Sequence, residues 1–397
     1  MHRVLLFFFL FFSFSFVGYT QKAFRPIKSA LKQKNYKEVI DQVNALEKDS
    51  LYSSSSKLCI YKIDALRGLN NAENMKIYLK QEYDTVAFFS TTYEIIQQTI
   101  KLDSLEYQGV LEGNSKPKYA NHVVDLLTTY FPNLHAASRF FYLKRNYAEA
   151  MKYLRVCLDV PHLPIGIKSR LSTKHDVSNA SLYLISAYKN KDYEEVSRYE
   201  SLSLQDTLVR SSILECLINT AEAQKEYAKY LHWLNMAWEE YPHTKYFFTK
   251  LADYYVAKSD YSQVLNIAER QMAVDSTDCI ASFAKCLAFF NLKRFDECID
   301  EGNHIIENDT TYVDAYYYVG ASYVAKGNDI TFTDNALSPE YILSLDKQKK
   351  FYRYSQPYLE KYRSLRPSLP KRWAPLLYKI YLSLNEGKKF AEIEKYL

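Results

Sequence analysis

The sequence predicts an all-α fold built from pairs of helices that repeat along the chain. Three observations support this prediction: apolar residues recur every 34 positions, the 397 residues include only 9 Gly and 11 Pro, and aromatic residues reach 16%. Glycine and proline this scarce disfavour a chain made of tight turns and strand hairpins. The 37 tyrosines suit half-buried helix seams, because the ring packs while the hydroxyl stays hydrated.

The first twenty residues differ from the rest of the chain. Arg3 is followed by an uncharged run of fourteen residues, Val4 to Val17, and small residues close the segment at Gly18 and Thr20. This arrangement is typical of a secretory signal peptide. Such a run spans about 21 Å as a helix, less than the roughly 30 Å of a bilayer core. We expect residues 1–20 to be a signal peptide, with an uncleaved anchor as the alternative, and no transmembrane segment in the mature chain.

The repeat itself is clearest between residues 177 and 327. Two series carry the 34-residue period: Tyr193, Tyr227, Tyr261 and Phe295, and three positions later Val196, Tyr230, Val264 and Cys298. Self-similarity at a fixed period indicates one supersecondary unit used repeatedly, with neighbouring units burying a shared core.

This pattern resembles the tetratricopeptide repeat (TPR) family, whose unit is a 34-residue helix–turn–helix. Residues 211–244 fit the motif with Leu214, Leu217, Ile218, Ala221, Tyr227, Tyr230, Leu234, Ala237 and Pro242. The resemblance implies a right-handed α-α superhelix, a solenoid of roughly nine or ten hairpins. Small residues at two positions of each unit are expected to let its helices approach closely.

The expected organisation follows from how well each region fits. Residues 21–130 are interpreted as degenerate N-terminal hairpins, with 54–87 fitting poorly and 88–130 reading as a helical pair. Residues 131–369 are interpreted as the TPR array, with insertions at 165–176 and 328–350. Residues 370–397 are interpreted as the capping hairpin that the end of a solenoid requires.

Catalytic motifs are not found in the sequence. It has no Gly-rich phosphate loop, HExxH, GxSxG or CxxC pair. His135, His162, His243 and His304 have no companion at metal-ligand spacing. We therefore expect no enzyme, no metal and no cofactor. The rival interpretation is an enzyme, or its regulatory half, with a site in residues 54–130 or 328–350.

Two cysteines leave two interpretations open. Cys286 and Cys298 occupy positions that the repeat fills with small apolar residues, which predicts packing. These positions meet across one hairpin, and export implies an oxidising compartment, so a disulfide is the alternative.

A partner surface is predicted from the resemblance, which implies that the first helices line an inner, concave face. Ile280, Phe283, Leu287 and Phe290 are spaced as one stripe of a helix on that face, so they would be exposed unless something covers them. The superhelical curvature or the 328–350 insertion is the alternative cover. The candidate partner-binding residues are Asn219, Tyr246, Ile280, Phe283, Leu287, Phe290, Asn291 and Tyr317.

A basic segment lies between Ser344 and Arg372. Its candidate patch consists of Lys347, Lys349, Lys350, Arg353, Arg363 and Arg366, and the acids of the segment are Asp346 and Glu360. A solvated helix face is the plain interpretation, and docking to an anionic surface or acidic protein is the functional one. Without residues 1–20 the formal charge of the chain falls from +5 to +4, too mild to predict nucleic acid as a partner.

These observations predict a non-enzymatic protein–protein scaffold of a bacterial cell envelope, periplasmic or associated with the outer membrane. Its groove would bind a partner segment during envelope assembly or secretion. A glycan- or lipid-handling module using Tyr246 and Tyr317, or the regulatory half of an envelope enzyme, is the alternative.

Overall fold

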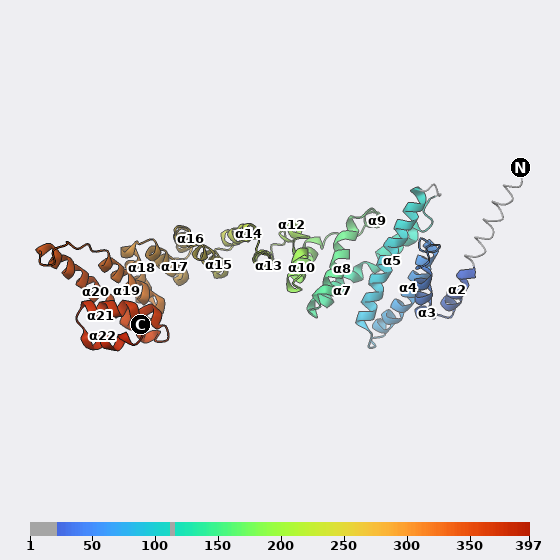
Figure 1. Cartoon of the computed structure of the whole chain (residues 1–397). Coiled ribbons are helices and arrows are strands. Elements are labelled where there is room, and N and C mark those ends of the chain that lie inside the picture. Colours follow the sequence, from blue (N-terminus) through green and yellow to red (C-terminus); the bar gives the residue numbers. More distant parts are fainter. Residues whose placement is uncertain (1–21, 112–115) are drawn as a thin grey trace, which may run out of the picture. The chain divides into compact units, whose positions relative to one another are not determined.

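The computed structural model describes residues 22–111 and 116–397. The expected signal peptide, residues 1–20, lies outside these ranges. Every regular element in the described residues is a helix, which confirms the all-α fold. None of these helices is long and apolar enough to span a membrane. The chain divides into two compact units, Met1–Lys225 and Glu226–Leu397, whose helices are labelled in Figure 1.

The second unit carries the 34-residue period in its helix boundaries. Its second-helix series starts at Tyr227, Tyr261 and Phe295, and its first-helix series starts at Lys245, Cys279 and Val313. The elements are α14 (Tyr227–Glu240), α15 (Lys245–Ala257), α16 (Tyr261–Val274), α17 (Cys279–Asn291), α18 (Phe295–Asn308), α19 (Val313–Asn328), α20 (Pro339–Leu365), α21 (Pro370–Ser383) and α22 (Gly387–Glu394). Consecutive helices pack on each other as α15/α16, α17/α18, α19/α20 and α21/α22.

The turns of the hairpins repeat as well. Ser259 and Lys293, 34 residues apart, have φ angles of 56° and 60°, in the left-handed region. In the second of these turns, the Lys293 amide donates to the Phe290 carbonyl at 3.1 Å and the Arg294 amide to the Phe289 carbonyl at 2.9 Å. This is the hydrogen-bond pattern of a left-handed helix C-cap. The turn geometry is therefore kept without the glycine that usually occupies such a position.

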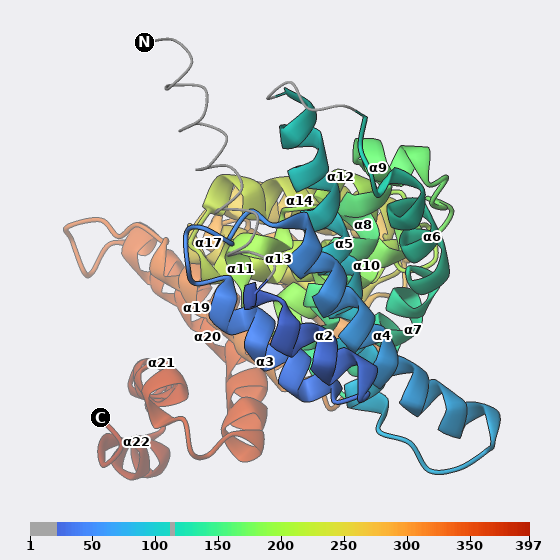
Figure 2. The same ribbon diagram turned by 90° about the vertical axis from the view of Figure 1, so that its right-hand side faces the viewer.

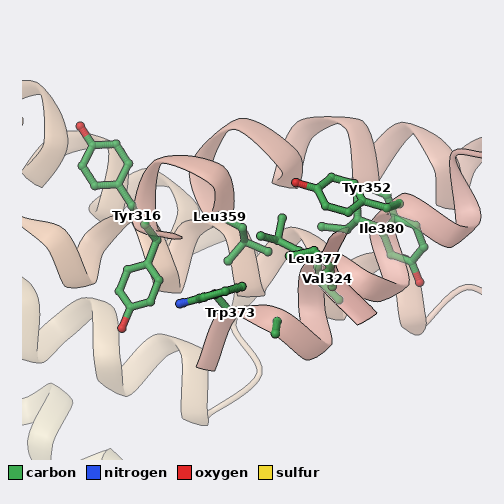
Figure 3. Packing of buried hydrophobic residues seen from close by; sticks show 11 residues of the cluster. Tyr316, Val324, Tyr352, Leu359, Trp373, Leu377 and Ile380 are labelled. Carbon is green, nitrogen blue, oxygen red and sulfur yellow. The ribbon is translucent and has the colours of Figure 1, made fainter. Parts of the chain in front are cut away.

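Small residues bring α19 and α20 together as the repeat predicts. A Cβ atom on Gly320 would lie 2.7 Å from the Leu359 Cγ atom, too close for a side chain. The Ser355 hydroxyl donates to the Gly320 carbonyl at 2.7 Å. This contact leads into the core that joins α19 to the last hairpin. Figure 3 shows that core, which includes Tyr316, Val324, Tyr352, Leu359, Trp373, Leu377 and Ile380.

The expected insertion at 328–350 is largely helical. After a loop, α20 begins at Pro339, so the second helix of this hairpin starts well before residue 351. The side chain of Ser338 accepts a hydrogen bond from the Tyr341 amide, and Pro339 takes the first helical turn, where no amide donor is needed. The Gln348 side chain then donates to the Gly327 carbonyl at 3.0 Å, which ties the extension to α19.

The first unit is less regular. Its elements are α2 (Arg25–Lys32), α3 (Tyr36–Leu46), α4 (Ser56–Tyr78), α5 (Thr85–Leu111), α6 (Ala120–Tyr130), α7 (Pro132–Leu143), α8 (Tyr147–Asp159), the 3₁₀ helix η1 (Val160–His162), α9 (Pro164–Lys168), α10 (Asp176–Lys189), α11 (Tyr193–Val196), α12 (Glu200–Ser203) and α13 (Arg210–Ala223). The turn geometry of the second unit recurs at Lys34, Arg145, Lys191 and Lys225, each at positive φ.

Residues 54–87 do not form a hairpin of their own. Most of the segment is the single helix α4, which pairs with α5. The buried side-chain amide of Asn70 joins the two helices by donating to the Phe88 carbonyl at 2.9 Å and to the Thr92 hydroxyl at 3.0 Å. Both helices exceed the usual repeat length, and Figure 2 shows their connection reaching out from the other helices of this unit.

The second helix expected after Tyr193 is broken into two short pieces, α11 and α12. The Glu195 carboxylate accepts from the Tyr183 hydroxyl at 2.6 Å and lies 2.9 Å from an Arg155 nitrogen. The Tyr199 hydroxyl donates to an Asp159 carboxylate oxygen at 2.6 Å. The break between α11 and α12 therefore lies between Glu195 and Tyr199, whose side chains bind residues of α8 and α10. The 34-residue pattern carries no information about these contacts.

Candidate protein-interaction surface

The predicted apolar stripe lies on α17. This helix begins at a well-formed cap, in which the Asp278 carboxylate accepts from the Ile280 amide at 2.9 Å and the Ala281 amide at 3.3 Å. One face of α17 is buried through Ala281, Ala284 and Ala288. The stripe occupies another face, which contains Ile280, Phe283, Leu287 and Phe290. Ile280 is 37% exposed, and the other three side chains are half-buried.

Helix α19 provides the partial cover of this stripe. The Phe283 ring lies 5.2 Å from the Tyr312 ring and 5.7 Å from the Tyr318 ring, measured between centroids. The Phe290 ring lies 5.2 Å from the Tyr318 ring. Such separations are those of favourable edge and tilted aromatic pairs. We call Ile280, Phe283, Leu287, Phe290 and Tyr318 the aromatic surface. It is a partly covered apolar surface, and the cover comes from Tyr312 and Tyr318 of the next hairpin and not from the 328–350 segment.

The rim of this surface is charged. Tyr317 lies on α19 next to Tyr318, and the guanidinium of Arg372 stacks over its ring at 4.0 Å. Arg372 also donates to an Asp314 carboxylate oxygen at 2.8 Å. Burial raises the pKa of Tyr318 to about 12, so its hydroxyl stays neutral at physiological pH. A partner would therefore meet apolar rings bordered by a neutral donor and an ion pair.

The remaining predicted partner residues are placed differently. Asn291 is exposed at the end of α17, where its amide donates to the Leu287 carbonyl at 2.8 Å. Tyr246 is half-buried on α15, with its ring 5.4 Å from that of Phe247. Asn219 is half-buried on α13, in the first unit. The structure thus brings Tyr317 and Asn291 to the helices that carry the stripe, while Tyr246 and Asn219 lie on other helices.

The predicted basic patch is divided along α20. Lys347, Lys350 and Arg353 are exposed on its first half, and Lys349 is half-buried. In the second half, Arg363 lies 2.5 Å from a Glu392 oxygen and stacks over the Trp373 ring at 5.2 Å. The Arg366 side chain is exposed, while its carbonyl accepts from the Trp373 indole. Arg363 is therefore paired within the fold, and the charge available to an anionic surface is concentrated in the first half.

The cysteine pair lies where its positions in the repeat predict. The Sγ atoms of Cys286 and Cys298 lie 3.5 Å apart, so the two positions do meet across the α17/α18 hairpin, and both are buried free thiols. The hydrogen bond between them and burial raise the pKa of Cys286. No group of three residues suited to a metal occurs in the described ranges.

Sequence reasoning missed a polar cluster in the first unit. His162 lies 2.8 Å from an Asp176 oxygen, and the His135 ring lies 5.5 Å from the His175 ring. These residues are up to 41 positions apart, so their spacing in the chain carries no signal. The interruption of the repeat at 165–176 was the sole hint, because a segment that breaks the period is free to do something else.

Comparison with known proteins finds similar solved structures but no matching family or curated protein. Among solved structures, it is similar to the C-terminal part of a TPR repeat-containing protein from Cytophaga hutchinsonii, at 13% identity over 65% of this chain and 92% of that one, with a TM-score of 0.43. It is also similar to yeast Tom70, at 9% identity over 91% and 88% of the chains, with a TM-score of 0.32.

A third similar structure is the TPR2AB domain of yeast Sti1 in complex with pHSP90, at 17% identity over 82% of this chain and 95% of that one, with a TM-score of 0.26. The fold class rests on the protein's own geometry: 34-residue helix–turn–helix units with recurrent turns and small residues at the helix contacts. The chain therefore has an all-α fold of repeated helical hairpins, in which the regular part repeats every 34 residues.

Proposed function

We propose that this protein is a non-enzymatic scaffold of the cell envelope, which binds a segment of a partner protein on the aromatic surface of α17 and α19. The single observation that carries the proposal is the incomplete cover of the stripe. Phe283, Leu287 and Phe290 are half-buried, and Ile280 remains 37% exposed in line with them. A partner side chain that fills the remaining space would bury rings already held in place, so little ordering entropy would oppose binding.

The envelope location is supported by the sequence of residues 1–20, which has the plan of a signal peptide. A role in envelope assembly or secretion would suit an exported hairpin repeat, because such proteins bind extended or helical segments without covalent chemistry.

The structure identifies better test positions than the two phenylalanines. Phe283 and Phe290 pack on α19, so a charge there would disturb the fold as well as the surface. Ile280 and Asn291 are exposed and flank the same stripe. Ile280→Asp and Asn291→Arg should leave the helical content and thermal unfolding unchanged while weakening capture of the partner. Leu208→Asp is the matched control, because Leu208 is 93% exposed in the first unit.

The measurement is quantitative affinity purification from an envelope extract, followed by binding of the recovered protein to purified wild type. We expect about a tenfold loss of affinity for Ile280→Asp, the size of loss expected for one apolar contact of an interface. Recovery of the same protein with equal affinity by wild type and Ile280→Asp would refute the proposed surface.

Peripheral contact with an anionic surface is the second part of the proposal, and it rests on Lys347, Lys350 and Arg353. The chain should bind vesicles containing anionic lipid more tightly than neutral vesicles, and the difference should shrink as salt rises. Lys347→Glu with Lys350→Glu should abolish that difference. Equal binding to both vesicle types would remove this part of the proposal.

A further inference from the structure

A second site candidate lies in the first unit, on other helices than the aromatic surface. A pocket of about 340 Å³ is lined by residues of the α6–α7 junction and of the loop between α9 and α10. Thr128, Phe131 and His135 come from the first segment, and Ser169, Arg170, Lys174 and His175 come from the second. The loop belongs to the 165–176 interruption, so the pocket is built by the part of this region that the repeat does not explain.

The pocket is rich in positive charge. Arg170 and Lys174 are exposed, and no ion pair of either residue occurs in residues 22–111 or 116–397. The imidazoles of His135 and His175 lie beside each other, with ring centroids 5.5 Å apart. Asp176, two residues after Lys174, faces His162 at 2.8 Å with one carboxylate oxygen, and its other oxygen has no hydrogen-bond partner among the described residues. The two cationic side chains therefore have no counter-charge of their own in the described fold.

A buried hydroxyl also lines the pocket. Ser169 is 7% exposed, and its Oγ atom has no hydrogen-bond partner among the described residues. A buried polar group without a partner costs free energy, so such a group usually binds water, an ion or a ligand. The pocket also lies at the start of the fourteen-residue helix α10, where His175 is the N-cap and makes no side-chain cap hydrogen bond. The positive end of the helix dipole adds to the same charge.

We propose that this pocket binds a phosphate group. Arg170 offers a planar pair of donors that matches phosphate oxygens, and Lys174 adds a mobile charge. Two cations without ion pairs match a dianion better than the single charge of a carboxylate. The phosphate site lies in the first unit, and the proposal does not depend on the aromatic surface of α17 and α19.

The charges around His135 give the site an expected pH dependence. Burial lowers the pKa of His135, and the charges of His175 and Arg139 lower it further, while Asn179 and Asp176 oppose the shift. An anion bound next to Arg170 and Lys174 would raise that pKa again, so protonation and binding should favour each other. Binding of sulfate, whose charge is constant in this range, should strengthen as the pH falls from about 7.5 to about 5.5.

The test uses the full chain and isothermal titration with inorganic phosphate and with sulfate. Arg170→Gln and Lys174→Gln should each weaken binding about tenfold, the loss expected for one hydrogen bond to a charged group. The matched control is Arg145→Gln: Arg145 is also an exposed arginine in a helix-terminal loop, with φ 58° against 53° for Arg170.

Two outcomes would overturn the proposal: no binding of either anion by the wild-type chain at pH 6, or equal weakening by Arg145→Gln and Arg170→Gln. Thermal unfolding of each variant checks that the loop change leaves the fold intact. The source of the phosphate is distinguished by two further probes. Binding of glycerol phosphate without binding of phosphatidylglycerol vesicles indicates a soluble phosphate ester, and vesicle binding that Arg170→Gln abolishes indicates a lipid headgroup.

Discussion

The two units of this chain pack their helices in different ways. In the second unit, the helix starts from α14 to α19 and the turns at Ser259 and Lys293 follow the 34-residue period. In the first unit, the period is interrupted by long helices, a broken helix and a polar loop. Where the repeat holds, the side chains that pack hairpins are fixed by the period, and function is left to the other helix faces. Where it fails, polar networks hold the helices together and create pockets.

The largest expected effect tests close packing in the second unit. Gly320→Val should lower the free energy of unfolding by about 2–3 kcal/mol, because its side chain would overlap Leu359 and push α19 away from α20. Gly387→Ala is the control, since a Cβ atom there meets nothing within 4 Å. Urea unfolding followed by circular dichroism measures both. A tolerated Gly320→Val would show that the hairpin contact is looser than the structure indicates.

An intermediate effect tests the polar network of the first unit. Glu195→Gln should cost about 1–2 kcal/mol at pH 7, because the hydrogen bond from Tyr183 and the ion pairs with Arg155 and Arg198 weaken. Glu194→Gln is the control, because Glu194 is an exposed neighbour.

The same variant has a defined pH dependence. The hydrogen bond from Tyr183 lowers the pKa of Glu195, with a further contribution from Arg155 and Arg198, although burial opposes it. A lowered folded-state pKa means that the stabilisation is complete above the unfolded-state value of about 4.3 and is lost as the pH falls through the folded-state value. The difference between wild type and Glu195→Gln should therefore shrink as the pH falls below the unfolded-state value and vanish at the pH where Glu195 is protonated in the folded state as well. A difference that stays constant from pH 7 to that point would exclude the network as its cause.

The smallest expected effect concerns the turn residue Lys293. Lys293 adopts the left-handed conformation that glycine adopts without strain. The free energy of unfolding should be about 1 kcal/mol larger for Lys293→Gly than for Lys293→Ala. Both variants lose the lysine side chain, but only glycine removes the strain of a left-handed backbone. Thermal unfolding of the two variants gives the difference. Equal melting temperatures would mean that the turn relaxes when the side chain changes.

Much of this architecture was predictable because it is local and periodic. The spacing of Tyr227, Tyr261 and Phe295 gave the starts of α14, α16 and α18, and small residues such as Gly320 gave the helix contacts. The meeting of Cys286 and Cys298 followed from their places in one unit. A position in a repeat implies its neighbours whenever both lie within the same hairpin.

The errors arose where contacts join residues that no period relates. The segment 54–87 fits the repeat poorly, and the structure shows why: Asn70 and its partners on α5 hold α4 as one long helix. The start of α20 depends on Ser338 and Pro339, a cap inside what looked like an insertion.

The sequence by itself determined an all-α chain of repeated hairpins and the face on which the stripe of α17 would lie. Tertiary structure alone decided how far that stripe is covered, because the rings of Tyr312 and Tyr318 come from the next hairpin. It also decided which cations remain unpaired, leaving Arg170 and Lys174 beside a buried Ser169 while Arg363 binds Glu392. Helix periodicity depends on nearby positions in the chain, whereas burial and ion pairing depend on distances in space that the period does not encode.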